Sequence, residues 1–245
     1  MRRLLGITFG VLTHLLFGVT VWQLFRFLQG SAHHQRGGLS IDLLLAAQFA
    51  AFHSLLLTPR VRSRLERWIS PAFYGLFFCT VTCLSLGLVM IQWRSDSVVV
   101  WQATGLAATA VEGAFGASWL ALFYSLHLSG LGYQTGWTPW RFWLRGEPAP
   151  RRRFQPRSAF LLMRHPVYLS FLGLIWFAPT VTLDRALLIA VWTVYIFLGS
   201  YLKDRRLQYY LGPTYREYQA RVPGYPGMIV GPLARVPWGE QGAAE

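Results

Sequence analysis

Residues 71–93 read PAFYGLFFCTVTCLSLGLVMIQW, a stretch of 23 residues that contains no charged side chain. A soluble helix carries its apolar residues in stripes that repeat every three or four positions, with polar residues between them. Here the apolar residues continue without such interruptions. Because about 18 to 20 consecutive apolar residues span the hydrocarbon core of a bilayer, this stretch predicts a membrane-spanning helix.

Five further apolar blocks extend this prediction to most of the chain. They are Leu5–Leu28, Leu39–Thr58, Ala103–Gly130, Pro166–Leu183 and Arg185–Leu202. The last two are short and are joined at Asp184, which predicts a tight helical hairpin. Only 13% of the residues are charged and 53% are hydrophobic, whereas a soluble domain is about 25% charged. The sequence therefore predicts an all-α polytopic membrane protein with about six transmembrane helices.

The net charge of +13 is concentrated in alternate loops of this predicted topology. Loops rich in arginine and lysine mark the cytoplasmic side of a membrane protein. We therefore expect both termini to be cytoplasmic, in a bacterial inner membrane, with the basic rim beside anionic membrane lipid and not bound to nucleic acid. The basic residues on this side are Arg2, Arg3, Arg60, Arg62, Arg64, Arg67, Arg141, Arg145, Arg151, Arg152, Arg153, Arg157, Arg164, Lys203, Arg205 and Arg206.

The sequence contains no linker that would separate independent domains, so we expect one membrane domain over residues 1–245. Its expected parts are a four-helix part (1–132), a cytoplasmic loop (133–163), a hairpin with a tail (164–230) and a flexible end (231–245). In the tail, apolar and aromatic residues recur at helical spacing among charges, and Gly212-Pro213 interrupts them. This pattern predicts a C-terminal amphipathic segment on the cytoplasmic side.

The strongest local motif is Arg164-His165-Pro166-Val167-Tyr168. Proline suits the first turn of a helix, because the N–H that it lacks would have no partner there. The motif therefore places Arg164 and His165 at a helix N-terminus, where backbone N–H groups and the guanidinium favour an anion. The alternative is the ordinary positive flank of a membrane helix.

Two histidines, His53 and His127, lie near the predicted cytoplasmic ends of the second and fourth spans. Ionisable groups inside a membrane are costly and usually face a cavity or a partner. The topology places both histidines at a similar depth, on the same side as Arg164 and His165. Each could also be a satisfied hydrogen-bonding group. Cys79 and Cys83 are expected to be packing residues, and no cysteine–histidine spacing typical of a metal site occurs.

These motifs resemble those of the isoprenylcysteine carboxyl methyltransferase superfamily. The resemblance rests on Arg164-His165-Pro166-Val167-Tyr168, followed by Asp204-Arg205-Arg206-Leu207 and by Gly212, Tyr215, Tyr218, Val222 and Pro223. Upstream segments, Gln48–Ser54 and His127–Gln134, are similar to the branch that holds the NnrU-like and methanethiol S-methyltransferase proteins. The resemblance covers most of the chain.

The resemblance implies a methyl transfer that depends on S-adenosylmethionine, at the cytoplasmic membrane face, to a small thiol or a lipophilic acceptor. The residues that it assigns to the cofactor are Arg164, His165, Pro166, Tyr168, Asp204 and Tyr215. A thiol acceptor must lose a proton, and neutral histidine is suited to that near pH 7, so His53 and His127 are the candidate catalytic residues. The chain departs from the family pattern at Lys203-Asp204, where two adjacent glutamates are common.

Two other functions are compatible with the same residues. In a haem-binding membrane protein of the NnrU-like isomerase type, His53 and His127 would ligate the iron of haem b from two helices. A non-catalytic membrane scaffold would keep the fold without the complete acidic pair. The oligomeric state is left open by the sequence.

Overall fold

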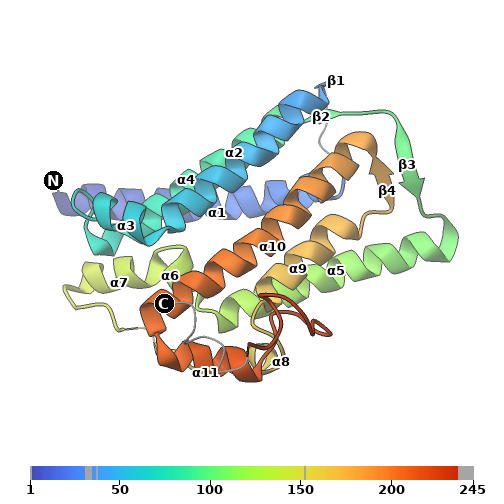
Figure 1. The fold of residues 1–245 in the computed structure, drawn as a ribbon. Helices are drawn as coiled ribbons and strands as arrows, with labels where there is room; N and C mark the ends of the chain where they lie inside the picture. The colour runs from blue at the N-terminus through green and yellow to red at the C-terminus, as the bar shows by residue number, and fades with distance from the viewer. Residues whose placement is uncertain (1, 31–34, 37, 152, 237–245) are drawn as a thin grey trace.

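The computed structural model describes residues 2–30, 35–36, 38–151 and 153–236 (Figure 1). Within this part of the chain, five helices are long and apolar enough to cross a membrane. They are α1 (Arg2–Leu28), α2 (Leu39–Leu57), α4 (Pro71–Gln92), α5 (Gly105–Leu128) and α10 (Leu183–Leu211). These helices confirm the prediction of an all-α, polytopic integral membrane protein.

The expected fifth span differs most from the prediction. Residues 166–183 form an 11-residue helix, α9 (Pro166–Trp176), followed by the strand β4 (Thr180–Thr182). Eleven residues rise about 16 Å, roughly half of a hydrocarbon core of about 30 Å. The helix stops before Pro179, because a residue that precedes proline is disfavoured in helical conformation. The strand β4 then pairs antiparallel with β3 (Val99–Gln102).

The helix that follows is longer than predicted. It continues beyond the expected end at Leu202 for more than two further turns, to Leu211, where Gly212 and Pro213 end it. The first half of the predicted amphipathic tail is therefore the end of α10. The second half is α11 (Pro213–Arg221).

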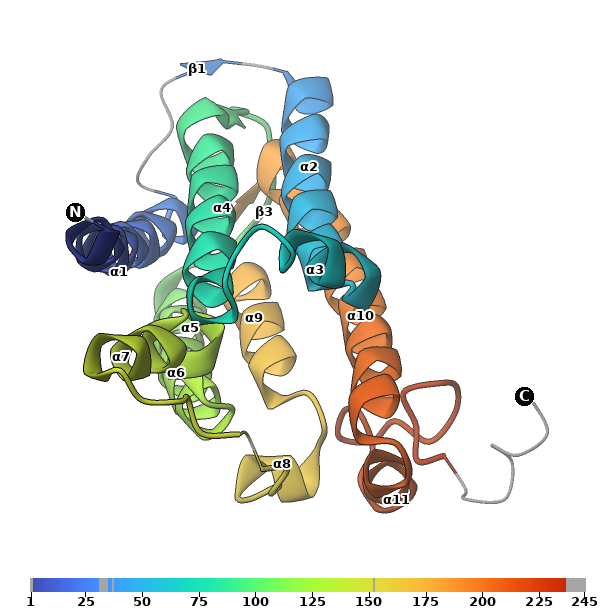
Figure 2. The ribbon, with the colours of Figure 1, turned by 90° about the vertical axis from the view of Figure 1, so that its left-hand side faces the viewer.

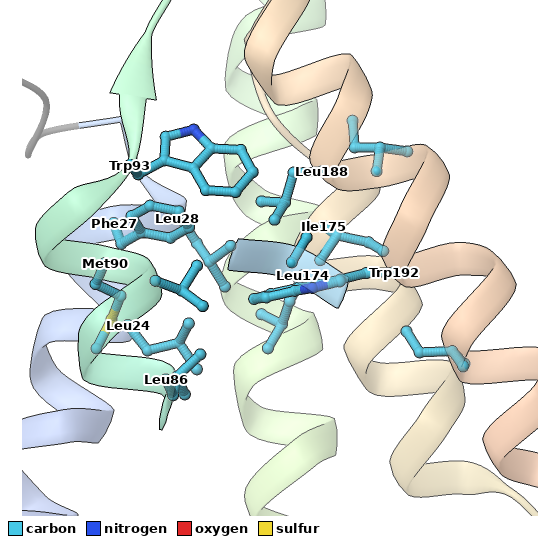
Figure 3. Packing of buried hydrophobic residues seen from close by; sticks show 14 of the residues in the cluster. Leu24, Phe27, Leu28, Leu86, Met90, Trp93, Leu174, Ile175, Leu188 and Trp192 are labelled. Atoms are coloured by element: carbon cyan, nitrogen blue, oxygen red, sulfur yellow. The ribbon is translucent and has the colours of Figure 1, made fainter. Parts of the chain in front are cut away.

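The long helices pack in the spatial order α1, α4, α2, α10, α9, α5, which differs from their order in the chain. The order can be followed in Figures 1 and 2. A buried apolar cluster from most of these helices fills the centre of the bundle, as Figure 3 shows. Its members include Leu24, Phe27 and Leu28 of α1, Leu86 and Met90 of α4, Leu174 and Ile175 of α9, and Leu188 and Trp192 of α10.

The short helices lie toward one end of the bundle and carry the basic loops (Figure 2). They are α3 (Pro59–Leu65), α6 (Leu131–Gln134), α7 (Trp137–Arg145), α8 (Ala159–Leu162) and α11. The opposite end holds β1 (Gln35–Arg36) beside β2 (Arg94–Ser95), together with the β3–β4 pair. The loops that the sequence assigned to one membrane side are therefore on one end of the molecule.

The segment 133–163, predicted as a long loop, is partly helical and packs against the bundle. Helix α7 contacts α1 and α4, and Trp140 is buried there, with its indole N–H donating to the carbonyl of Gly6 at 2.9 Å. Near the C-terminus, Leu233 and Ala234 are also buried, so the expected flexible end does not begin at residue 231. Residues 237–245, the rest of that expected end, lie outside the described residues.

The contact between α4 and the turn before α7 leaves no room for a side chain. A Cβ atom added to Gly75 would lie 2.6 Å from the Cα of Gly136, which is backbone and cannot yield. Gly87 lies in the same helix, and a Cβ added there meets no atom within 4 Å.

We expect Gly75→Ala to destabilise the protein by about 1–3 kcal/mol, the usual cost of overpacking. Gly87→Ala is the matched control and should be neutral or stabilising, because alanine favours a helix over glycine by about 1 kcal/mol. Thermal unfolding of both variants in the same detergent measures the contrast. Equal melting temperatures for the two variants would contradict the close approach of α7 to α4.

Candidate active site

Arg164, in the motif at the start of α9, is a buried cation. Its side chain is 1% exposed, and its Nε and Nη2 atoms lie 3.1 Å and 2.9 Å from the same carboxylate oxygen of Asp204. Its Nη1 atom donates to three carbonyl groups of the tail, those of Val222 at 2.6 Å, Ala234 at 3.1 Å and Gln219 at 3.4 Å. The guanidinium is therefore occupied by one carboxylate and by the backbone of the tail.

The backbone strengthens this connection between α9 and the tail. The amide of Arg164 donates to the carbonyl of Pro223 at 2.9 Å, and the amide of His165 donates to that of Gly224 at 3.2 Å. The tail is thus attached to the residues that open α9 by main-chain and side-chain hydrogen bonds together. Pro166 occupies the first helical turn, as predicted, and is buried.

Asp204 joins these groups to α10. Besides Arg164, it accepts a hydrogen bond from the hydroxyl of Tyr215, and its Oδ1 atom lies 3.2 Å from Nε2 of His165. We call Arg164, His165, Asp204 and Tyr215 the Arg164 network. Burial and the Asp204 charge raise the pKa of Tyr215 above its ordinary value, which keeps the phenol protonated as a donor.

His165 is a neutral member of this network. Its side chain is fully buried, and burial lowers its pKa below the ordinary value of 6.5, an effect that the Asp204 carboxylate only partly offsets. The charge of Asp204 is already matched by Arg164 at closer range. Among the described residues, Nδ1 of His165 has no hydrogen-bond partner.

A cavity of about 330 Å³ lies beside this network, between α2, α9 and α10. It is partly open, and we call it the His53–Tyr168 cavity after one residue on each side. Its lining is His53, Ser54, Leu57, Thr58, Pro59, Tyr168, Tyr195, Gly199, Leu202, Arg205, Arg206 and Tyr209. Tyr168 connects the cavity to the network, because its ring packs edge to face against the ring of His165, with the two ring centroids 5.5 Å apart.

The comparisons with known proteins agree with this arrangement. Methanethiol S-methyltransferase 1 of Bradyrhizobium diazoefficiens is 30% identical to the chain over 238 residues, which cover 90% of the chain and 81% of that relative. The chain belongs to the isoprenylcysteine carboxyl methyltransferase superfamily. Within it, the chain falls in the branch of the methanethiol S-methyltransferases.

Other members of the superfamily align over similar lengths. A methanethiol S-methyltransferase from Pseudomonas sp. strain GM41(2012) is 27% identical over 93% of the chain and 90% of its own length. Nurim of Rattus norvegicus is 30% identical over 74% of the chain and 72% of its own length. No protein-family model matches the chain, and no solved structure matches it. The superfamily members named methyltransferases support a membrane methyltransferase.

The structure separates the six residues that the superfamily resemblance assigned to the cofactor. Tyr168 lines the cavity, whereas Arg164, His165, Asp204 and Tyr215 form the buried network behind it. The position that is commonly acidic in the superfamily, Lys203, has its ammonium 5.3 Å from the centroid of the Tyr168 ring and 5.9 Å from that of Phe160.

The two histidines predicted as catalytic residues do not meet. His53 lines the cavity, whereas His127 is exposed on α5 and is not part of that lining. Helices α10 and α9 lie between α2 and α5 in the packing order (Figure 1). A haem iron held by both residues would require them to face one space, and the described residues do not provide it.

Sequence analysis missed the cavity residues of α10. Tyr195, Gly199, Leu202, Arg206 and Tyr209 follow one another at spacings of four, three, four and three, so they share one face of a continuous helix. The spacing is visible in the sequence. Because the helix was expected to end at Leu202, the sequence prediction did not place Arg206 and Tyr209 on the same face as Tyr195, Gly199 and Leu202.

We expect Arg164→Ala to destabilise the protein by about 3–5 kcal/mol, because it leaves the buried Asp204 carboxylate without its closest cation. The matched control is Arg221→Ala, which removes an exposed arginine that lies 3.6 Å from Glu217 and should cost less than about 1 kcal/mol. Chemical or thermal unfolding in detergent measures both. A loss for Arg164→Ala as small as that of the control would contradict the structural role of the pair.

The lowered pKa of His165 predicts a pH dependence of stability. The folded state favours the neutral ring, so its contribution is present above the unfolded pKa of about 6.5 and is lost as the pH falls below that value. The melting temperature should therefore decrease from pH 7.5 to pH 5.5, and by less in His165→Asn. His127→Asn, at an exposed position, should behave as the wild type. If His165 were instead charged against Asp204, its replacement would enlarge the decrease.

Proposed function

We propose that the chain transfers a methyl group from S-adenosylmethionine to a small thiol or another lipophilic acceptor, in the His53–Tyr168 cavity. The observation that carries the proposal is Tyr168, which belongs to the superfamily motif and lines the same cavity as a histidine. The alignment with methanethiol S-methyltransferase 1 over most of both chains gives independent support.

The lining residues suit S-adenosylmethionine. A volume of about 330 Å³ lies at the lower end of the range of about 300–1,000 Å³ for small-molecule sites. The rings of Tyr168, Tyr195 and Tyr209 can face a sulfonium or stack on a base, and the Ser54 and Thr58 hydroxyls can bond polar groups. Bound S-adenosylmethionine would occupy most of this cavity. The remaining space favours a small acceptor.

When bound, the cofactor would supply a methyl group on a positively charged sulfur, which is already a good leaving group. The protein must then hold donor and acceptor in line and exclude water. The tyrosine walls and Leu57 and Leu202 would perform that task. His53 would accept the proton of a thiol acceptor, whose sulfur takes up the methyl group as the thiolate.

The Arg164 network has a supporting role in this proposal. Its guanidinium is buried and paired with Asp204 and the tail carbonyls, so Arg164 would act as a positioning residue. It holds the start of α9, and thereby the backbone that carries Tyr168, against α10 and the tail. Asp204 supplies the carboxylate for this task, which the superfamily commonly places beside a second acid.

The face of the membrane follows from charge. The cavity lies at the end of the bundle that carries the arginines of α3, and such loops are typically cytoplasmic. We therefore propose that the reaction takes place at the cytoplasmic face, with both termini on that side. The relatives come from bacteria and from mammals, so the bacterial inner membrane stays a prediction.

The test compares the effect on methyl transfer of replacing His53, which lines the cavity, and His127, which does not. His53→Gln should lower kcat/KM for a small thiol at pH 7 by about 100-fold, the lower range for loss of a general base. His127→Gln should leave it near the wild-type value. Methyl transfer from labelled S-adenosylmethionine, measured with protein in lipid nanodiscs, provides the rates.

The pH of the assay separates base catalysis from a structural effect. With an acceptor whose thiol has the pKa of a cysteine side chain, near 8.5, the acceptor is mostly thiolate at pH 9.5, and the deficit of His53→Gln should shrink. A deficit that is unchanged at pH 9.5 would contradict the role of His53 as a base. Absence of any transfer by the wild type would favour the non-catalytic scaffold, and a Soret band in the purified protein would favour haem.

A further inference from the structure

Two arginines line the His53–Tyr168 cavity and have no role in the transfer described above. Arg205 and Arg206 lie on α10, immediately after Leu202, and both belong to the cavity lining. Arg205 is exposed and Arg206 is half-buried. Arg205 therefore lies at the exposed side of the cavity, whereas Arg206 and His53 are both partly buried.

Among the described residues, no acidic side chain neutralises the charge of these arginines. No aspartate or glutamate is among the residues that line the cavity. Within the part of the chain that the structure describes, neither Arg205 nor Arg206 forms an ion pair, in contrast to Arg62, Arg164 and Arg221. The lining of the cavity thus carries two positive charges that no acidic side chain of the described residues pairs.

Arginine at such a place recognises a specific chemistry. The guanidinium presents a planar set of N–H donors that matches the two oxygens of a carboxylate, and charge-assisted bonds of this kind are about twice as strong as neutral ones. We infer that Arg205 and Arg206 form an anion-binding site that takes a carboxylate of a small ligand.

The inference deepens the proposed function and rests on it for the identity of the ligand. The carboxylate can belong to the methyl donor, whose methionine part carries one. It can equally belong to an acceptor that bears a carboxylate in addition to its thiol. Both sources share the same recognition chemistry, so matched ligands are needed to distinguish them.

The experiment measures binding by calorimetry to the full chain in nanodiscs of zwitterionic phosphatidylcholine. The donor pair is S-adenosylmethionine and its decarboxylated analogue. The acceptor pair is 6-mercaptohexanoate and 6-mercaptohexanol, which have the same chain length and differ in the carboxylate. Each pair is titrated into the wild type, into Arg205→Gln/Arg206→Gln and into the control Arg221→Gln, whose lost charge lies outside the cavity lining.

In at least one pair, we expect the wild type to bind the carboxylate ligand about tenfold or more tightly than its partner, as for a charge-assisted hydrogen bond. The double variant should lose this preference, while Arg221→Gln keeps it. The pair that shows the effect identifies the source. Raised salt should reduce the preference, because it screens partly exposed charges.

Two results would overturn the inference. One is a wild type that distinguishes neither pair, and the other is a preference that survives in the double variant. Unchanged melting temperatures would show that the variants are folded. A wild type that prefers a carboxylate but transfers no methyl group would refute the proposed function and leave the anion site standing, so the two failures are distinguishable.

Discussion

The buried pair of Arg164 and Asp204 is the constraint on which one end of the bundle depends. Removing two charges from water is costly, and close geometry with additional hydrogen bonds is required to compensate. Here Nε of the guanidinium donates a hydrogen bond to the carboxylate, Nη2 lies within ion-pair distance of it, and Nη1 donates to three carbonyl groups of the tail. The pair thereby fixes three segments, the start of α9, the C-terminal third of α10 and the tail, relative to one another.

In this arrangement, some residues of the superfamily motif hold the backbone in place and another lines the cavity. Arg164 and His165 are enclosed by protein and shape the backbone, whereas Tyr168, one helical turn later, reaches the cavity. Residues from different helices then complete the lining: His53 from α2 and Arg206 from α10. The motif that the sequence suggests as a binding site thus mainly supports the site. Of its side chains, the aromatic ring of Tyr168 lines the cavity.

The sequence predicts the membrane helices well, because an uninterrupted apolar block has few alternatives in water or lipid. It predicts less where tertiary contacts decide. Pro179 shortens α9, and the packing of Trp140 against α1 orders a segment expected to be a loop. In the site, His53 was found from its polarity in an apolar helix. His127 gave the same signal but faces outward, which only the three-dimensional packing reveals, and Arg205 and Arg206 were missed with the extension of α10.

The central claim is that the His53–Tyr168 cavity binds the methyl donor. Gly199 lines that cavity, and a Cβ added there would lie 3.5 Å from the Tyr168 ring, so a leucine at this position would fill the space without replacing any residue of the Arg164 network. Calorimetric titration of S-adenosylmethionine into wild type and Gly199→Leu is therefore the most direct measurement. The account predicts one binding site in the wild type and much weaker binding in the variant. No binding by the wild type, or equal binding by both, would contradict it.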